Sequence, residues 1–372
     1  MKIRYLFLSV AFFILIGIPS TAQNNKRPHE VLTLKQNDYF KEQPKNVILL
    51  IGDGMGVAQV FSAFTANKGA LNMTQMPFTG FSLTQSANDY ITDSAAGGTA
   101  LSTGQRTYNG AIAVDTNKIA IPTIVEISKS RGYATGLVSS SSITHATPAS
   151  FIAHQPSRRM QEEIAADFIG TDIDVFIGGG RKYFVNRKDG RNLFNELIHD
   201  NYLVFNSLDE AASVNIGKIA ILTAEKHNET YPKRGEMLPE ATQKAIDILK
   251  NNEKGFFLMV EGSMIDWGGH DNNTAYIIQE TLDFDRAIGK ALEFASSNNE
   301  TLVVITADHE TGGMTITGGS IEKGKVSGKY TTMGHTAVMV PVFAYGAGAD
   351  KFTGVYNNTE IFDKIMEAFG FN

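Results

Sequence analysis

The chain of 372 residues contains no cysteine. No disulfide can therefore stabilise the fold, and no thiol can act as a nucleophile or a metal ligand. Basic residues are also the minority, with 33 lysines and arginines against 39 aspartates and glutamates. Because non-specific nucleic-acid binding requires a basic surface, we expect no nucleic acid as a specific partner. A large core or bound metal must supply the stability that disulfides provide in many exported proteins.

A long apolar run opens the chain. Lys2 and Arg4 precede the apolar residues 5–18, and Ser20-Thr21-Ala22 offers small side chains to a signal peptidase. The run has the length of a signal-peptide core and is short for a membrane span. We predict that residues 1–22 are a signal peptide that is removed, with an uncleaved N-terminal anchor as the alternative. The mature chain would then be exported to the periplasm or secreted, without a membrane segment and with a formal charge of −8 once Lys2 and Arg4 are lost.

The remaining sequence alternates between two patterns. Residues 23–45 are polar and contain proline, which predicts a poorly ordered lead-in. Apolar, β-branched runs then alternate with stretches of helical period, which lie at 122–131, 240–250 and 274–296. Runs that are apolar on both faces indicate parallel strands covered on both sides. We predict an α/β fold with a mainly parallel central sheet and helices on both faces, forming one domain over 46–372; the strand-like runs are 46–52, 133–139, 173–177, 218–222, 255–260, 301–306 and 340–345.

Acidic residues follow three of the predicted strands. Asp53 comes directly after N-V-I-L-L-I-G, Glu261 after G-F-F-L-M-V, and Asp308-His309 one residue after T-L-V-V-I-T. The carboxyl ends of parallel strands are where open α/β sheets bind ligands. Carboxylates are costly there unless something pairs with them. An isolated Asp53 could equally cap a helix, so only the set as a whole indicates a site.

The spacing of the histidines favours metal binding. Asp266 and His270 are four residues apart, so a helical turn would project both from one side, either as ligands of one ion or as a surface ion pair. The glycines at 268 and 269 weaken the ion-pair interpretation, because an exposed helix disfavours them. With the other imidazoles, the chain can form two groups of three ligands and leaves Glu261 for a harder ion that prefers oxygen; the groups are Asp266, His270 and His335, and Asp53, Asp308 and His309.

Two further stretches each allow two interpretations. Ser94, in T-D-S-A-A-G-G-T-A, is either part of a turn before a small-residue helix or an accessible nucleophile. Thr147 is either an oxygen ligand or the N-cap of a surface helix whose first turn contains Pro148. If Thr147 is an oxygen ligand, Arg158 could hold an oxyanion with two hydrogen bonds. If Thr147 caps a surface helix, Arg158 would only complement the helix dipole. The spacing alone does not decide between them.

Taken in order, the polar motifs resemble the signatures of the alkaline phosphatase family. Six of them occur in the family's order between residues 46 and 346, which covers nearly all of the mature chain. A chance match of six ordered motifs is very improbable. The motifs read NVILLIGDGMG, TDSAAGGTA, THATPASFIAHQPSR, FLMVEGSMIDWGGH, TADHETGG and GHTAVMVPVFAYG.

The resemblance implies hydrolysis of phosphate monoesters at alkaline pH on a three-layer α/β sandwich, with two Zn²⁺ and one Mg²⁺. Ser94 would be the nucleophile that becomes phosphorylated, and Arg158 would clamp the phosphate, with Arg159 as the alternative register. Asp93 would position Arg158. The first zinc would be held by Asp266, His270 and His335 and the second by Asp53, Asp308 and His309, while Asp53, Thr147 and Glu261 would hold magnesium. Family members commonly dimerise, so a homodimer is expected.

Three positions depart from parts of the family. Trp267 stands where many relatives have a lysine or histidine, and His145 where some bacterial members have an aspartate beside the magnesium site. Thr311 replaces a second histidine after the Asp-His pair. These changes bear on metal preference and turnover. Residues 314–333 form a short insert where animal members carry a sizeable extra domain, so we expect a compact form.

Other activities fit the residues less well. Three divalent ions, four carboxylates, an ionised Ser94 and Arg158 give the site a formal charge of about +2, which suits a phosphate-ester dianion better than a sulfate ester or a phosphodiester. A related phosphodiesterase or phosphonate hydrolase is the nearest alternative, but the T-H-A-T-P…S-R motif favours a monoesterase. A triad hydrolase would need G-x-S-x-G around the serine. A periplasmic binding protein with structural metals is the remaining alternative.

Overall fold

The computed structural model describes residues 27–34 and 43–371. The predicted signal peptide, residues 1–22, lies outside the described residues. Residues 27–34, which fall within the predicted lead-in, pack against the fold. The buried imidazole of His29 lies 2.9 Å from the carboxylate of Asp285, and the backbone amide of Leu32 donates to Asn72. The polar groups of this short segment thus have partners on the domain, and the poorly ordered lead-in over 23–45 stays a prediction.

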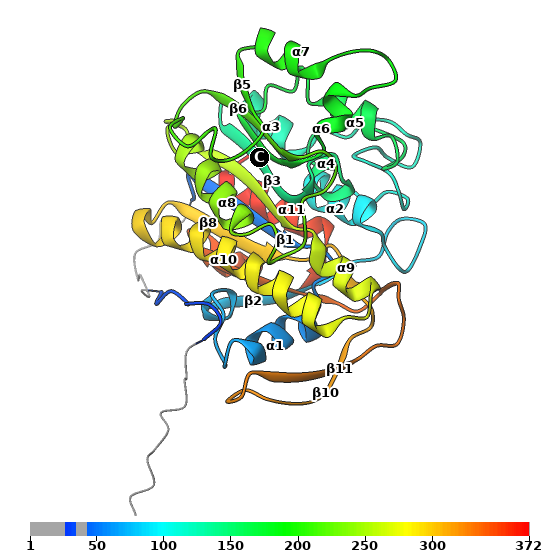
Figure 1. The fold of residues 1–372 in the computed structure, drawn as a ribbon, viewed down its shortest axis with the longest axis vertical. Helices are drawn as coiled ribbons and strands as arrows, with labels where there is room; N and C mark the ends of the chain where they lie inside the picture. The colour runs from blue at the N-terminus through cyan, green and yellow to red at the C-terminus, as the bar shows by residue number, and fades with distance from the viewer. Residues whose placement is uncertain (1–26, 35–42, 372) are drawn as a thin grey trace, which may run out of the picture.

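A ten-stranded sheet forms the centre of the molecule (Figure 1). Most neighbouring strands are parallel, whereas β13 runs antiparallel to both β8 and β2. The prediction of a mainly parallel sheet is confirmed. In spatial order the strands are β14 (Gly354–Asn357), β2 (Phe78–Leu83), β13 (Val340–Gly346), β8 (Thr301–Thr306), β1 (Asn46–Gly52), β7 (Phe256–Gly262), β3 (Ala134–Ser142), β4 (Val175–Gly179), β6 (Lys218–Ala224) and β5 (Tyr202–Phe205).

The strand β1 shows why the sheet is covered on both faces. All seven of its residues are buried. Ile48 and Leu50 belong to one apolar cluster, and Leu49 and Ile51 belong to another on the opposite face. Because side chains alternate along a strand, a run that is apolar at every position needs a layer of helices on each side.

Helices supply both layers. The Ile48 side is covered mainly by α1 (Val57–Ala66), α8 (Met237–Leu249), α9 (Met264–His270) and α10 (Thr274–Asn298). Figure 1 shows α8 and α10 on the near side of the sheet. The opposite side is covered by α2 (Ser94–Thr103), α3 (Ile124–Ser130), α4 (Ala146–Ala149), α5 (Gln161–Asp167), α6 (Arg181–Val185), α7 (Leu193–His199) and α11 (Thr359–Phe369).

Small elements complete the fold. Two 3-10 turns, Met73–Gln75 and Ala349–Phe352, connect larger elements. Residues of the predicted 314–333 insert form a hairpin of β10 (Thr315–Ser320) and β11 (Lys325–Lys329), which lies beside α1 at the lower end of Figure 1. The two-residue strands β9 (Glu310–Thr311) and β12 (His335–Thr336) pair antiparallel. This small ladder places two histidine-bearing segments next to each other.

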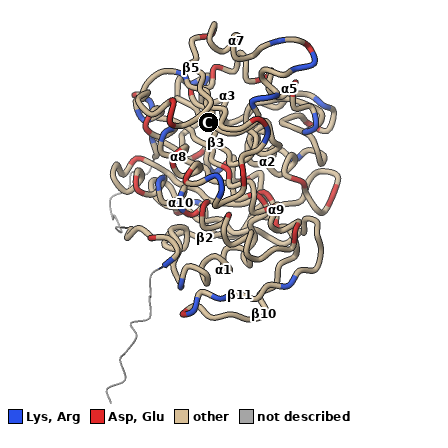
Figure 2. The backbone as a smooth tube through the Cα atoms, in the orientation of Figure 1, with Lys and Arg blue, Asp and Glu red and all other residues tan. Residues whose placement is uncertain are grey.

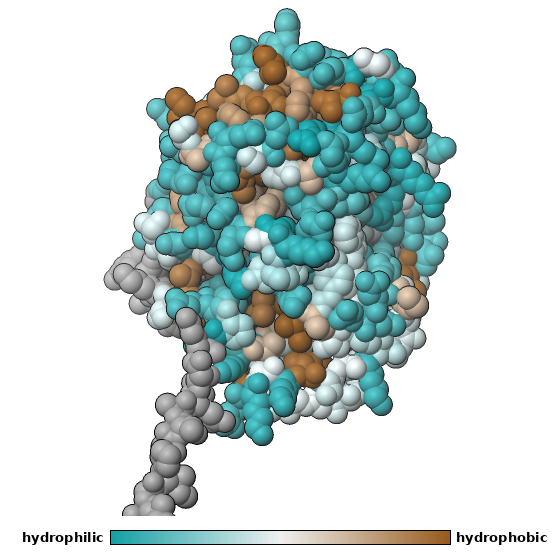
Figure 3. Space-filling view, in the orientation of Figure 1, coloured by the Kyte–Doolittle hydropathy of each residue, from teal (hydrophilic) through white to brown (hydrophobic). Residues whose placement is uncertain are grey.

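The surface is mixed in character. Figure 2 shows acidic and basic residues interspersed along the chain. In Figure 3 apolar residues gather at the α7–β5 end, where Ile198 and Leu203 are exposed. Within residues 27–34 and 43–371, none of the helices combines the length and apolar character needed to cross a membrane.

Candidate active site

The acidic residues that follow the strands meet at one edge of the sheet. In the parallel ladder Ile51 of β1 pairs with Glu261 of β7 and with Thr306 of β8. Asp53 and Asp308 come two residues after these β1 and β8 positions. On the other side of β7, Ser139 of β3 pairs with Glu261. The sheet register alone therefore brings residues from four strands together.

Ser94 begins the helix α2 at this edge. The preceding residue, Asp93, is the N-cap and accepts a hydrogen bond from the amide of Ala96 at 3.0 Å. Ser94 Oγ lies 3.3 Å from His309 Nε2. Helix amides and the positive end of the helix dipole favour an anion beside this hydroxyl. Gly97 allows the close approach, since a Cβ there would lie 3.1 Å from the Cβ of Asp308.

Asp266, His270 and His335 form a cluster that we call the outer group. Asp266 and His270 lie on one face of α9, with Oδ2 and Nε2 3.3 Å apart. His335 Nε2 lies 3.2 Å from His270 Nε2. Both imidazoles turn Nδ1 towards a backbone carbonyl, that of Met333 at 2.5 Å and that of Thr92 at 2.9 Å. Such contacts fix the tautomer with the proton on Nδ1 and leave Nε2 free to bind a metal.

Asp53, Asp308 and His309 form a second cluster, the inner group. His309 Nε2 lies 3.5 Å from Asp53 Oδ1 and 3.4 Å from Asp308 Oδ2, and all three side chains are fully buried. A third group consists of Asp53, His145 and Glu261. In each of the three groups one ligand atom per residue lies within 4.8 Å of the others. Asp53 belongs to both the inner and the third group.

Several atoms of these groups have no hydrogen bond within the described part of the chain. Each buried polar atom left unpaired costs about 1–3 kcal/mol. A cation surrounded by oxygen and nitrogen ligands would offset that cost, so the residues fit metal ions. The unpaired atoms of the groups are both carboxylate oxygens of Asp53, Asp308 Oδ2, Glu261 Oε1 and His145 Nδ1, and Thr147 Oγ1, outside the groups, is also unpaired.

Protonation differs between the groups. Burial, together with the neighbouring carboxylates, raises the pKa of Asp53, and burial and Asp266 raise the pKa of Asp308 to about 8. Burial lowers the pKa of His309. In the outer group the hydrogen bond to Asp266 raises the pKa of His270 to about 9. Although burial opposes ionisation, that bond and the nearby imidazoles hold the pKa of Asp266 well below its usual range.

Serines that the motif analysis did not select hold Glu261. Its Oε2 accepts hydrogen bonds from Ser139 Oγ and Ser263 Oγ, both at 2.6 Å. The other oxygen, Oε1, is buried and has no hydrogen bond among the described residues. Burial raises the pKa of Glu261, although the two hydroxyls lower it. The signal in the sequence was the serine run at the end of β3, which a buried strand would not carry without polar partners.

Arg158 reaches the site from a loop. Its Nη1 donates to Asp93 Oδ2 at 3.0 Å, as predicted for a positioning role of Asp93, and its Nη2 lies 3.3 Å from His145 Nε2. Burial, with the positive charge of Arg158, lowers the pKa of His145 to about 3, so this imidazole is neutral. Arg158 contacts Asp93 and His145, so its position favours it over Arg159 as the phosphate-binding arginine.

The prediction of Thr147 as the N-cap of a helix is wrong. The helix α4 has only four residues, and its N-cap is His145, whose backbone is extended. Thr147 therefore lies inside the helix, and its hydroxyl is free for another role. Arg158 does not lie on α4, because the chain leaves the helix after Ala149. The surface-helix alternative fails because Thr147 is fully buried.

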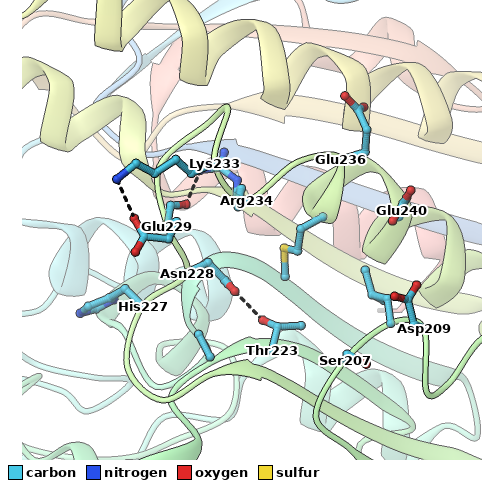
Figure 4. A pocket seen from close by; sticks show the side chains of 13 residues that line it. Ser207, Asp209, Thr223, His227, Asn228, Glu229, Lys233, Arg234, Glu236 and Glu240 are labelled. Atoms are coloured by element: carbon cyan, nitrogen blue, oxygen red, sulfur yellow. Dashed lines mark hydrogen bonds and ion pairs between the residues drawn. The ribbon is translucent and has the colours of Figure 1, made fainter.

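Trp267 and a histidine that sequence reasoning missed lie beside the third group. The ring of His227 packs edge-on against Trp267 and His145, with centroid distances of 5.0 and 5.7 Å. His227 also borders a pocket of about 440 Å³ at the same edge of the sheet (Figure 4). Asn228 and Thr223 are hydrogen-bonded within this pocket at 2.7 Å. No local pattern marks His227, because it lies in a loop far along the chain from its partners.

Comparisons with known proteins agree with this geometry. The family model described as alkaline phosphatase matches residues 44–328. Alkaline phosphatase 4 of Bacillus subtilis is 34% identical, over 97% of this chain and 95% of the relative. The alkaline phosphatase of Escherichia coli is 32% identical, over 91% of this chain and 89% of the relative.

Solved structures are similar over most of the chain. The alkaline phosphatase of the Antarctic bacterium TAB5 has a TM-score of 0.84 and 43% identity, over 90% of this chain and 100% of that chain. A variant of the TAB5 enzyme with a histidine changed to aspartate, with Mg bound in a site called M3, has a TM-score of 0.83, 43% identity and the same coverage. The chain, with its motifs, its fold and these relatives, belongs to the alkaline phosphatase family and is a phosphatase.

Proposed function

We propose that the enzyme hydrolyses phosphate monoesters through a phosphoserine at Ser94, with two Zn²⁺ in the outer and inner groups and one Mg²⁺ in the third group. Membership of the family supports phosphomonoester hydrolysis. The observation that carries the mechanism is the position of Ser94 Oγ, at the start of α2 and 3.3 Å from His309 Nε2 of the inner group. A hydroxyl in such a place can act as a nucleophile without a histidine base.

Ser94 is the group that forms the new bond. Its Oγ loses a proton and attacks phosphorus, and the bond between phosphorus and the ester oxygen breaks as the alcohol leaves. Water then attacks phosphorus from the vacated side, the bond to Oγ breaks, and inorganic phosphate leaves while Ser94 regains its proton. Divalent ions in the inner and outer groups would lower the pKa of the hydroxyl and stabilise charge on the attacking and leaving oxygens.

Arg158 and the start of α2 bind the phosphate. The guanidinium can donate two parallel hydrogen bonds to non-bridging oxygens, and its ion pair with Asp93 fixes it in that direction. The amides at the start of α2 add further donors. Both contacts would grow stronger as charge accumulates on the phosphoryl oxygens. They would therefore stabilise the transition state more than the bound substrate and increase the rate.

The ligand chemistry supports different ions in different groups. Two imidazoles and one carboxylate in the outer group suit zinc. The third group offers carboxylate oxygens from Asp53 and Glu261, which together with the hydroxyl of Thr147, outside the group, suit magnesium. His145 and Trp267 would lie beside that ion and adjust its binding. The magnesium in the TAB5 variant supports a magnesium position in this fold.

Hydrolysis of a chromogenic phosphate monoester at alkaline pH tests the proposal. We expect activity in the wild type that a chelator removes, and loss of nearly all activity in Ser94→Ala. Ser102→Ala on the same helix is the matched control, since Ser102 Oγ donates to Ser150 O away from the groups. Equal hydrolysis by the wild type and Ser94→Ala would contradict the proposal.

We further propose that residues 1–22 are removed during export to the periplasm or the medium, and that residues 46–372 act as one catalytic domain in a homodimer. N-terminal sequencing of the exported protein should find a start near Gln23. Light scattering after size exclusion should give twice the chain mass. Retention of Met1, or a monomer at micromolar concentration, would overturn the corresponding part.

A further inference from the structure

The hydroxyl of Thr311 lies between the outer and the inner group. Its Oγ1 is 2.5 Å from Asp266 Oδ1 and 3.2 Å from His309 Nδ1. Asp266 belongs to the outer group and His309 to the inner one. Thr311 is fully buried and supplies no ligand atom to either group. One side chain thus contacts a ligand residue of each group.

The direction of the two hydrogen bonds follows from the number of protons. A threonine hydroxyl has one proton to donate and lone pairs to accept. An ionised carboxylate only accepts, so the hydroxyl proton goes to Asp266. Towards His309 the hydroxyl can then only accept, which requires the proton of that imidazole to be on Nδ1. Nε2 is left with its lone pair towards Ser94 and the carboxylates of the inner group.

The backbone around Thr311 fixes this bridge. Its amide donates to Gly54 O at 3.2 Å, and its carbonyl accepts from Gln59 Nε2 at 2.9 Å. The same Nε2 donates to Glu310 Oε1 at 2.7 Å, and the carboxylate of Glu310 also accepts from Thr336 beside His335. The β9–β12 ladder pairs Thr311 with His335. Thr311 is therefore tied to both histidine-bearing segments.

Two glycines leave room for a small side chain at position 311. A Cβ on Gly54 would lie 2.8 Å from Thr311 Oγ1, and a Cβ on Gly269 would lie 2.8 Å from Thr311 Cβ. Gly54 also has a φ of +72°, which other residues rarely adopt. Any side chain at position 54 or 269 would collide with Thr311, so glycine at both positions allows its hydroxyl to lie against Asp266. The contact between Thr311 and Asp266 therefore depends on the surrounding backbone as well as on the two side chains.

We propose that Thr311 is a positioning residue that couples the two groups, holding Asp266 in place by donating to it and holding His309 in the metal-binding tautomer by accepting from it. The proposal rests on the proposed function, because it assumes that both groups bind metal. Partners of this kind, one step removed from the ion, typically change metal affinity by about 10–100-fold when they are removed. Loss of one hydroxyl should therefore weaken both groups together.

Cobalt titration of the metal-free protein tests the proposal. The visible absorption of bound Co²⁺ reports the ligand geometry, and chelator competition reports the affinity of each position. Thr311→Val keeps the shape without the hydroxyl, and Thr311→Ser keeps the hydroxyl. The matched control is Thr242→Val, since Thr242 is also fully buried and its hydroxyl donates only to Leu238 O of its own helix.

We expect Thr311→Val to bind Co²⁺ about 10–100-fold more weakly at both groups and to show altered absorption bands. Thr311→Ser and Thr242→Val should resemble the wild type. Wild-type affinity in Thr311→Val, or weakening of only one group, would overturn the proposal while leaving the proposed function intact. A wild-type protein that binds no Co²⁺ would overturn the proposed function itself.

A second comparison covers the case in which Thr311→Val does not fold. Thr311→Ala and Thr311→Ser both reduce the side chain, but only serine keeps the hydroxyl. Equal Co²⁺ affinity in these two variants would overturn the proposal. Tighter binding by Thr311→Ser would support it.

Discussion

The outer and the inner group each bring three ligand residues together, but in opposite surroundings. The outer group has one carboxylate between two imidazoles, and the His270 side chain is 41% exposed. The inner group has two carboxylates and one imidazole, all fully buried, and Glu261 lies close by. Protonated His270 can neutralise Asp266 without a metal, whereas the inner carboxylates have no equivalent partner.

The two groups should therefore depend on metal to different degrees. In the outer group a bound ion would replace a proton that already balances the charge. In the inner group burial and neighbouring carboxylates raise the pKa values of Asp53 and Asp308, so ionisation without a cation is costly. Metal should therefore matter more for the inner group, in both catalysis and stability.

The largest expected effect comes from removing a ligand of each group in turn. Asp53 is shared by the inner and third groups, so Asp53→Ala should lower kcat/KM by at least about 10³-fold, several kcal/mol of transition-state stabilisation. His270→Ala in the half-exposed outer group should cost less, and added Zn²⁺ should recover part of its activity. Steady-state kinetics with a metal titration measures both. A larger loss in His270→Ala would reverse the comparison.

The two groups should also differ in how their stability depends on pH. In the metal-free protein the raised pKa of Asp308, about 8, stabilises the fold at pH below its ordinary value near 4, and this contribution disappears as pH rises through 8. The raised pKa of His270, about 9, likewise stabilises the metal-free fold below pH 6.5, and this contribution is lost as pH rises through 9. The chelated protein should thus lose stability between pH 6.5 and 9, while the metal-bound protein should not.

Calorimetry with and without chelator measures this effect. We expect the difference in Tm between the two forms to grow by at least several degrees across that range, since about 1 kcal/mol corresponds to a few degrees in a chain of this size. Asp308→Asn should flatten the dependence in the chelated protein. A Tm difference that is constant with pH would contradict the account of the inner group.

The third group offers a smaller change. His145 is neutral because its pKa is lowered to about 3, so His145→Asp adds a negative charge beside Asp53 and Glu261. We expect Mg²⁺ to bind about tenfold more tightly, because carboxylate number sets affinity for this ion. Isothermal titration measures it, with His145→Asn as the control that adds oxygen without charge. Equal Mg²⁺ affinity in the two variants would refute the electrostatic explanation.

A comparably small effect is expected for Asp93. Asp93→Asn keeps the helix cap but loses the charge that holds Arg158, so stability should hardly change while KM rises about tenfold. Asp93→Ala loses the cap as well and should also cost about 1 kcal/mol of unfolding free energy. Kinetics and denaturant unfolding separate the two roles. Identical kinetics in Asp93→Asn and the wild type would remove Asp93 from substrate binding.

The strands that carry the inner group were predictable from the sequence. β1, β7 and β8 are apolar at nearly every position, and this pattern leaves little choice but a doubly covered parallel sheet. Their carboxyl ends then bring the acidic residues together without further information. Shorter or half-exposed strands such as β2, β5 and β14 escaped prediction, because their burial depends on neighbours that are distant in the sequence.

Parts of the site that depend on loops were harder to predict. The limits of α4 follow from the extended backbone of His145, and a Thr-Pro pair does not reveal that conformation. His227 and Gln59 reach the site across long sequence separations, and neither lies in a motif with a chemical signature. The role of Thr311 could not be read from its identity, because a hydroxyl shows its partners only when the fold is known.

We propose above that Ser94 forms a covalent intermediate beside the inner group. Rapid acid quenching during turnover, followed by mass spectrometry of the peptide that contains Ser94, measures this directly. The account predicts a single added phosphoryl group on Ser94 in the wild type, absent from Ser94→Ala and from chelated protein. Turnover with no phosphoryl group on Ser94, under conditions that retain phosphoserine, or with the group on another residue, would contradict it.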